Sequence, residues 1–105
     1  MTQQDVAQRV LALAQEIGGV RNASLSDRVY ANLGISGGDA VEFYDKLEAD
    51  FSVDIRPVTE TVVDVPRRWF RKARRARVAR DPTLLEISSF IQTALANDRS
   101  ERVND

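Results

Sequence analysis

Residues 33–51 read LGISGGDAVEFYDKLEADF, and this stretch decides the fold that the sequence predicts. Ser36 and Asp39 have the spacing of a capping box, so we expect a helix to start at Gly37. Apolar residues then recur at helical spacing in one stripe, Ala40, Tyr44, Leu47 and Phe51, with Phe43 beside it. Five acidic residues, Asp39, Glu42, Asp45, Glu48 and Asp50, are spread over the rest of the helix. The stretch is therefore predicted to be an amphipathic helix with an acidic outer face.

Two more helices are predicted on either side of this stretch. Residues 2–17 have apolar residues at helical spacing, a capping pair in Thr2 and Asp5, and a glycine pair after the last turn. Thr83 and Glu86 form a third capping pair, which opens a last helix ending near residue 96. Residues 20–32 are expected to form a loop. A polar tail over residues 97–105 is expected to be disordered.

An insert of about residues 56–81 separates the acidic helix from the last helix, and much of it is basic. Residues 67–80 contain eight lysines and arginines and no acid. Trp69, Ala73 and Ala76 are spaced as one helical face after Pro66, a residue that the first turn of a helix tolerates. We therefore expect a basic amphipathic helix over residues 67–80. A short strand, an extended connector or one helical turn all fit residues 56–65.

Composition limits the chemistry that this chain can perform. Its 105 residues suit one domain, and 43% of them are apolar and 30% charged, as in globular proteins. The chain has no cysteine and no histidine, so it has no thiolate, no Ser-His-Asp triad and no zinc finger. We expect a protein that is not an enzyme and binds no metal. Since it shows no signal-peptide pattern and no transmembrane run, we expect a cytoplasmic location.

The predicted acidic helix and its surroundings resemble the acyl carrier proteins. That family has Leu-Gly-x-Asp-Ser-Leu, then Val-Glu-Leu, then Leu-Glu-x-x-Phe, and ends at an isoleucine. The matching residues here are Leu33-Gly34, Val41-Glu42, Leu47-Glu48, Phe51 and Ile55. The run LGISGGDA is also similar to a bacterial branch of small acyl-carrier-like proteins with the motif Leu-Gly-Ile-x-Gly-x-Asp-Ala. The resemblance implies an all-α, four-helix bundle over residues 1–96, with the basic helix inserted between its second and last helices.

The resemblance also identifies the position on which the family's function depends. Acyl carrier proteins carry phosphopantetheine on the serine of the Asp-Ser-Leu triplet, which corresponds here to Ser36-Gly37-Gly38. Gly37 has no hydroxyl, so it cannot be modified, and we expect no cofactor. Two roles remain open for Ser36: a helix cap, and a phosphopantetheine attachment site shifted by one residue.

The function predicted from these features is that of a non-catalytic module that binds another protein. The residues expected to bind the partner are Asp39, Glu42, Asp45 and Glu48 of the acidic helix and Arg67, Arg68, Trp69, Arg71, Arg74 and Arg75 of the insert. One alternative is an unusual acyl carrier modified at Ser36. Another is binding of nucleic acid or an anionic surface by the insert. The insert has a further interpretation, in which its arginines pair with the acidic helix of the same molecule.

Overall fold

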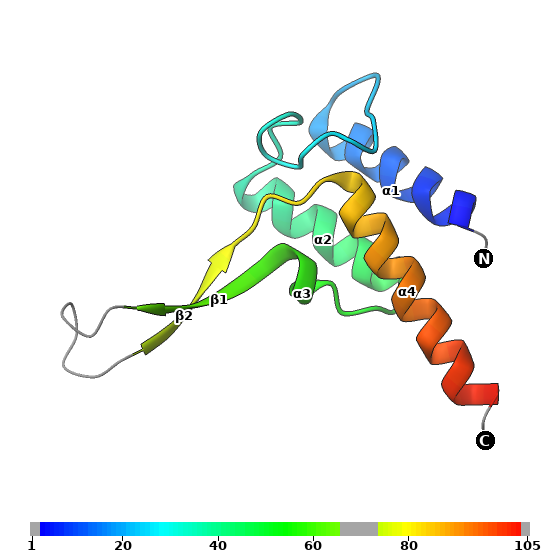
Figure 1. Ribbon diagram of the computed structural model, residues 1–105. Coiled ribbons are helices and arrows are strands. Elements are labelled where there is room, and N and C mark those ends of the chain that lie inside the picture. Colours follow the sequence, from blue (N-terminus) through cyan, green and yellow to red (C-terminus); the bar gives the residue numbers. More distant parts are fainter. Residues whose placement is uncertain (1–2, 66–73, 104–105) are drawn as a thin grey trace.

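The computed structural model describes residues 3–65 and 74–103, and this part of the chain is mostly helical (Figure 1). The elements follow in the order α1 (Gln3–Gly18), α2 (Gly37–Phe51), α3 (Arg56–Thr59), β1 (Glu60–Val65), β2 (Arg74–Ala79) and α4 (Leu84–Val103). The long helices α1, α2 and α4 form the body of the molecule, with α1 packed against both others. Strands β1 and β2 form a hairpin that projects from this body (Figure 1).

One hydrophobic core joins the three long helices, the loop after α1 and the segment around α3. The core residues below 2% exposure include Val6, Val10, Leu13, Val29, Ile35, Phe43, Leu47, Ile55, Leu84, Ile87 and Ile91. On α2 the centre of the buried face is Phe43, at 0% exposure, whereas Ala40 and Tyr44 are only partly buried. The predicted apolar face is therefore confirmed, with Phe43 rather than Tyr44 at its centre.

Helix ends follow the local chemistry that the sequence predicted. The Glu86 N–H donates to Thr83 Oγ1 at 3.1 Å, and the Thr83 N–H donates back to Glu86 Oε1 at 3.2 Å. This reciprocal pair is the predicted capping box of α4. Helix α1 ends at Gly18, and Gly19 has a φ of +67°, the left-handed conformation that glycine adopts without a steric penalty. Thr2, which was predicted to form a capping box with Asp5 at the start of α1, lies outside the described residues.

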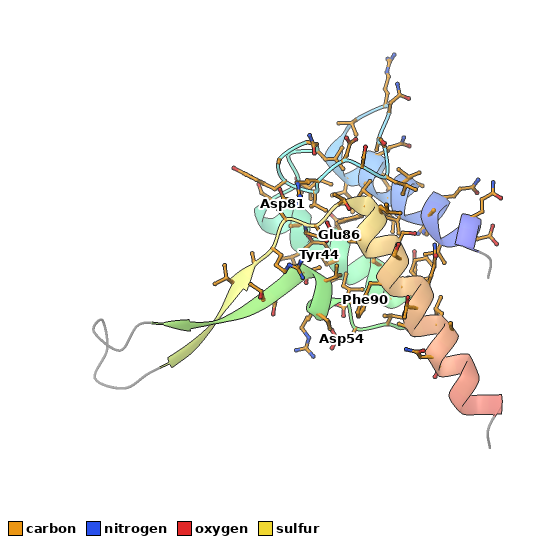
Figure 2. All side chains as sticks on the ribbon, in the orientation of Figure 1. Tyr44, Asp54, Asp81, Glu86 and Phe90 are labelled. Carbon is orange, nitrogen blue, oxygen red and sulfur yellow. The ribbon has the colours of Figure 1, made fainter. Side chains whose placement is uncertain are left out.

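The loop after α1 is fixed to the segment that leads into α4. Asp81 accepts two backbone hydrogen bonds from this loop, from the N–H of Tyr30 at 2.7 Å and of Ala31 at 3.0 Å. Backbone bonds from Val29 to Pro82 and from Leu84 to Asp27 continue the junction at 3.0 and 2.9 Å. We refer to residues 27–31 and 81–84 as the Asp81 junction. Two segments about fifty residues apart in the chain are thus joined at Asp81, which Figure 2 labels.

The basic insert differs from the prediction. Residues 74–79, expected to be helical, form strand β2, which pairs antiparallel with β1 from Glu60↔Ala79 to Val65↔Arg74. The physical reason lies in β1, whose β-branched run favours a strand and offers β2 a ladder of backbone partners. A pattern read within residues 67–80 alone cannot include this pairing. The all-α class is therefore corrected to a mostly helical fold with one hairpin, and residues 66–73 of the predicted helix lie outside the described residues.

Two further boundaries are settled by the structure. Residues 56–65, for which three conformations fitted, form one short helix, α3, followed by strand β1. Pro57 stands in the first turn of α3, where its missing N–H leaves no helical hydrogen bond unmade. The chain beyond residue 96 was predicted to be a disordered tail, whereas helix α4 continues to Val103.

Burial next to the Asp81 junction changes the acidity of Tyr44, which Figure 2 labels together with Asp81. Burial raises the pKa of Tyr44 from 10.0 to about 12, and the negative charge of Asp81 adds to the shift. Below pH 10 the phenol is neutral in both the folded and the unfolded chain. Between pH 10 and 12 the unfolded chain loses this proton and the folded chain keeps it, so the free energy of unfolding falls as pH rises.

We therefore predict that Tyr44→Phe reduces the loss of stability between pH 10 and 12. Urea unfolding, measured at several pH values across this window, checks the prediction. The matched control is Tyr30→Phe, because Tyr30 is 64% exposed and its removal should leave the alkaline loss of the wild type in place. An equal loss of stability in wild type and Tyr44→Phe would contradict the assignment.

Candidate interaction surface on helix α2

Helix α2 begins at a cap whose backbone, rather than its side chain, makes the hydrogen bonds. Ser36 is extended, at φ −150° and ψ 170°, and its carbonyl accepts the N–H of Asp39 at 3.2 Å and of Ala40 at 3.4 Å. The position predicted for the cap is confirmed. The Ser36 side chain makes no capping hydrogen bond, so the capping box predicted with Asp39 is wrong in this respect. The hydroxyl is consequently available on an exposed residue.

Gly37, at the position of the carrier family's serine, has a backbone conformation that favours glycine. Its φ is +55°, in the left-handed region where a side chain meets the neighbouring carbonyl. A Cβ built on Gly37 or on Gly38 would meet nothing within 4 Å. The restriction at Gly37 therefore comes from its own backbone and not from a lack of space. Any side chain there, a serine included, would be strained.

The acidic residues of α2 divide into two groups. In the second half of the helix they are engaged within the molecule: Glu48 Oε2 accepts the Ile55 N–H at 3.3 Å, and Asp50 pairs with Arg9 of α1 at 2.6 Å. In the first half, Asp39 and Asp45 are exposed, and neither has an ion-pair partner among the described side chains. The same helix thus uses its later acids to hold the fold and presents its earlier ones to solvent.

The exposed half of α2 also carries an apolar side chain. Val41 is 59% exposed, and residues three and four apart on a helix lie on one face, which places it beside Asp45. Glu42, the next residue in the chain, is also exposed and pairs with Lys46 at 3.3 Å. We name the group Asp39, Val41, Glu42 and Asp45 the α2 surface. It combines three carboxylates with one exposed apolar group.

Sequence reasoning identified part of this surface. Asp39, Glu42 and Asp45 were predicted to bind a partner, and all three are exposed. Glu48 was predicted as well, but it is half-buried and bonded to the chain after the helix. Val41 was not singled out as a site residue. The signal that could have found it is an apolar residue at a helical position off the buried face.

The structure does not bring the predicted basic residues to the α2 surface. Arg74 and Arg75 lie in β2, opposite Val65 and Asp64 of β1. The other four predicted residues of the insert, Arg67, Arg68, Trp69 and Arg71, lie outside the described residues. Within the described part of the chain, the acidic residues predicted to bind a partner therefore lie in α2, whereas the basic ones lie in β2.

Two other polar features near α2 are structural. Asp54 accepts hydrogen bonds from both the side chain and the backbone of Arg56, which lower the pKa of Asp54 to about 2, so this carboxylate closes the turn before α3. An open hollow between α1 and α2 is lined by Asp5, Arg9, Asp50 and Phe51, and the Arg9–Asp50 ion pair lies along it.

Among the described residues, no group of three or more acids is arranged to hold a metal ion.

Comparison of the chain with protein-family models, with curated proteins and with solved structures found no match. Within residues 3–65 and 74–103, no helix is long and apolar enough to cross a membrane. The function therefore has to be argued from the α2 surface and from the charges around it.

The two glycines at the start of α2 provide a matched pair of substitutions. Gly37→Ala is expected to lower the free energy of unfolding by about 1–2 kcal/mol, because alanine is strained at a positive φ. Gly38→Ala is expected to raise it by up to about 1 kcal/mol, because alanine favours a helix and meets nothing there. Urea unfolding of the two variants shows whether each substitution lowers or raises the free energy of unfolding as expected. Equal effects of the two substitutions would refute the left-handed conformation at Gly37.

Proposed function

We propose that the protein is a non-catalytic, acyl-carrier-like interaction module that binds a basic partner protein through the α2 surface. One observation carries the proposal: the later acids of α2 are engaged within the molecule, whereas Asp39 and Asp45 are exposed without a described ion-pair partner. Exposed charges of one sign attract a partner of the opposite sign and orient its approach. Val41, beside Asp45 at the edge of this group, supplies the apolar contact that such an interface needs.

The start of α2 supports the proposal in a second way. Neither Gly37 nor Gly38 has a side chain, so a partner can approach the backbone closely at this end of the helix. In the acyl carrier proteins, which this stretch of sequence resembles, the prosthetic group is attached here. Gly37 cannot accept that group, and its left-handed backbone opposes a serine at the same position. These features support a protein that keeps the docking surface of a carrier protein but lacks the serine to which the prosthetic group is attached.

A second candidate function is an acyl carrier with a shifted attachment site at Ser36. The observation that favours it is the Ser36 hydroxyl, which lies on an exposed residue and makes no capping hydrogen bond. Modification would join the serine oxygen to the phosphorus of coenzyme A's phosphopantetheine arm and release adenosine bisphosphate. The two functions therefore differ in one measurable property, which is added covalent mass.

The intact mass of the protein after incubation with a broad-specificity phosphopantetheinyl transferase and coenzyme A decides between them. We expect an unchanged mass, because the hydroxyl of Ser36 is one residue before the family's position. A carrier protein modified in parallel shows that the enzyme is active. Added mass that disappears in Ser36→Ala would replace the interaction module by a carrier.

Site-specific photocross-linking in cells tests the docking surface itself. A photoreactive amino acid at position 41 is expected to capture a partner, and Asp45→Lys in the same chain is expected to lower the yield about tenfold, since a like charge opposes a basic partner. Glu16→Lys is the matched control, because Glu16 is an exposed acid on α1. The same photoreactive residue at position 12, exposed on α1, measures unspecific capture. Equal capture from positions 12 and 41 would disprove the docking surface.

A further inference from the structure

Tyr44 lies on the side of α2 that faces the Asp81 junction. Burial and, after it, the negative charge of Asp81 raise the pKa of Tyr44 to about 12, so the Asp81 carboxylate is within electrostatic reach of the Tyr44 hydroxyl. In Figure 2 the segment that carries Asp81 passes α2 close to Tyr44. The Tyr44 ring packs against that of Phe43, with the centroids 5.5 Å apart, and Tyr44 is half-buried. The core thus holds the ring in place and leaves part of the residue open to solvent.

The carboxylate of Asp81 has acceptor capacity beyond the junction. Each of its oxygens accepts one N–H, Oδ1 from Tyr30 and Oδ2 from Ala31. An ionised carboxylate offers about four acceptor sites, so about two remain. Asp81 is half-buried rather than enclosed, so a group from solvent can reach it. The junction therefore uses part of this carboxylate and leaves the rest available to another donor.

The two arginines next to Asp81 are engaged with other groups. Arg28 Nη1 donates to the main-chain carbonyl of Asp81 at 2.5 Å, and Arg80 Nη2 lies 3.9 Å from Glu86 Oε2. Among the described side chains, none forms an ion pair with the Asp81 carboxylate. A half-buried negative charge without a paired cation attracts a cation from outside the chain.

Exposed apolar side chains belong to the elements that meet at this carboxylate. Tyr30 is 64% exposed, and the bond from its N–H to Asp81 Oδ1 places it beside the carboxylate. Val41 is 59% exposed and lies three residues before Tyr44 on α2, so the two share a face. We name Tyr30, Val41, Tyr44 and Asp81 the aromatic site. It combines one carboxylate with two aromatic rings, and it shares Val41 with the α2 surface.

A carboxylate beside aromatic rings favours one kind of ligand over others. A guanidinium group forms charge-assisted hydrogen bonds with a carboxylate and also stacks on an aromatic face. An ammonium group is a smaller and more strongly hydrated cation, so it gains less from the rings. Phosphates and carboxylates are repelled by Asp81 and by the acids of the α2 surface. An arginine side chain therefore suits the aromatic site better than a lysine or an anion.

We propose that the aromatic site binds an arginine side chain of the basic partner protein, with the guanidinium between the Asp81 carboxylate and the Tyr44 ring. The inference rests on the proposed function, for which it names the residue type that the partner inserts. The apolar stem of that arginine packs on Val41 and Tyr30. The interface thereby extends from the acids of α2 to the Asp81 junction. The rings add a preference for arginine to the attraction between opposite charges.

A nuclear magnetic resonance titration with two synthetic peptides tests the site. The first is an amphipathic peptide with arginines along one side, and the second has lysine in place of each arginine. The arginine peptide is expected to shift the ring signals of Tyr44 and Tyr30 and the amide signal of Ala31, because these groups adjoin the guanidinium. It is expected to bind about threefold more tightly than the lysine peptide. Equal affinities, or ring signals that the arginine peptide leaves unmoved, would overturn the proposal.

Substitutions at Tyr44 make the test specific to the ring. Tyr44→Leu removes the aromatic face, so it is expected to weaken binding of the arginine peptide about threefold and to abolish the preference over the lysine peptide. Tyr44→Phe keeps the face and is expected to restore both, which a loss caused by the missing hydroxyl would not do. Equal weakening by Leu and by Phe at this position would contradict the stacking of the guanidinium on the ring.

Asp81→Asn tests the charge. It keeps a side-chain oxygen for one bond of the junction and is expected to weaken binding of both peptides more than Glu16→Gln does, since Glu16 is an exposed acid on α1. Circular dichroism shows whether the fold is kept, and the Tyr44 substitutions still decide if Asp81→Asn unfolds. An affinity for the arginine peptide that falls no further than in Glu16→Gln would remove Asp81 from the site and overturn the proposal.

Further outcomes separate this inference from the function on which it rests. Arginine-peptide shifts confined to Asp39, Glu42 and Asp45, and unchanged in Tyr44→Leu, would overturn the aromatic site and leave the α2 surface standing. A partner that cross-links from position 41 with equal yield in wild type and Tyr44→Leu would do the same. No peptide shift at any of these residues, together with equal capture from positions 12 and 41, would reject both.

Discussion

The carboxylate of Asp81 holds the loop after α1 against the segment that leads into α4, and the arrangement around α2 depends on this contact. Its two oxygens accept the N–H groups of Tyr30 and Ala31, which lie in a loop where no helix or strand supplies backbone partners. Hydrogen bonds to a charged acceptor are stronger than those between neutral groups. Pro82, next in the chain, is fully buried. One dipeptide therefore joins two distant parts of the chain.

This junction positions the start of α2 and the base of the hairpin. It fixes the loop whose last residues, Leu33 and Ile35, enter the core and bring the chain to the start of α2. It also fixes the end of β2, since Arg80 and Asp81 are consecutive. The start of α2 and the base of the hairpin consequently leave the same framework at defined places. A small domain without disulfides can position these elements in this way because its loops are bonded to each other and not only to solvent.

The exposed acids of α2 follow from the requirements of its two ends. At the C-terminal end the helix packs against α1 and turns sharply into α3, so Glu48 and Asp50 are drawn into contacts with Ile55 and Arg9. At the N-terminal end acids are favourable in any case, because they lie near the positive end of the helix dipole. Asp39 therefore adds to helix stability without a partner. Exposed acidic residues at this end of the helix therefore cost the fold little energy.

Prediction from sequence was most successful where the deciding interactions are local. The capping box of Thr83 and Glu86 and the glycine after α1 involve residues within a few positions of one another, so spacing alone identified them. The buried face of α2 was predicted for the same reason. Ser36 shows the limit of spacing: the residue is at the cap, but its side chain does not make the expected bond. The left-handed backbone at Gly37 separates the two capping partners from ideal helical geometry.

The sequence by itself determined the three long helices, the faces that they bury, the strong separation of charge and the absence of a hydroxyl at position 37. These properties depend on residue type and on neighbours along the chain. Only the tertiary structure decided that residues 74–79 are a strand, because a strand exists through its pairing with β1 and not through its own periodicity. The tertiary structure likewise decided which acids of α2 are exposed. That choice depends on Arg9 and on the Ile55 N–H, which folding brings to one end of the helix and not to the other.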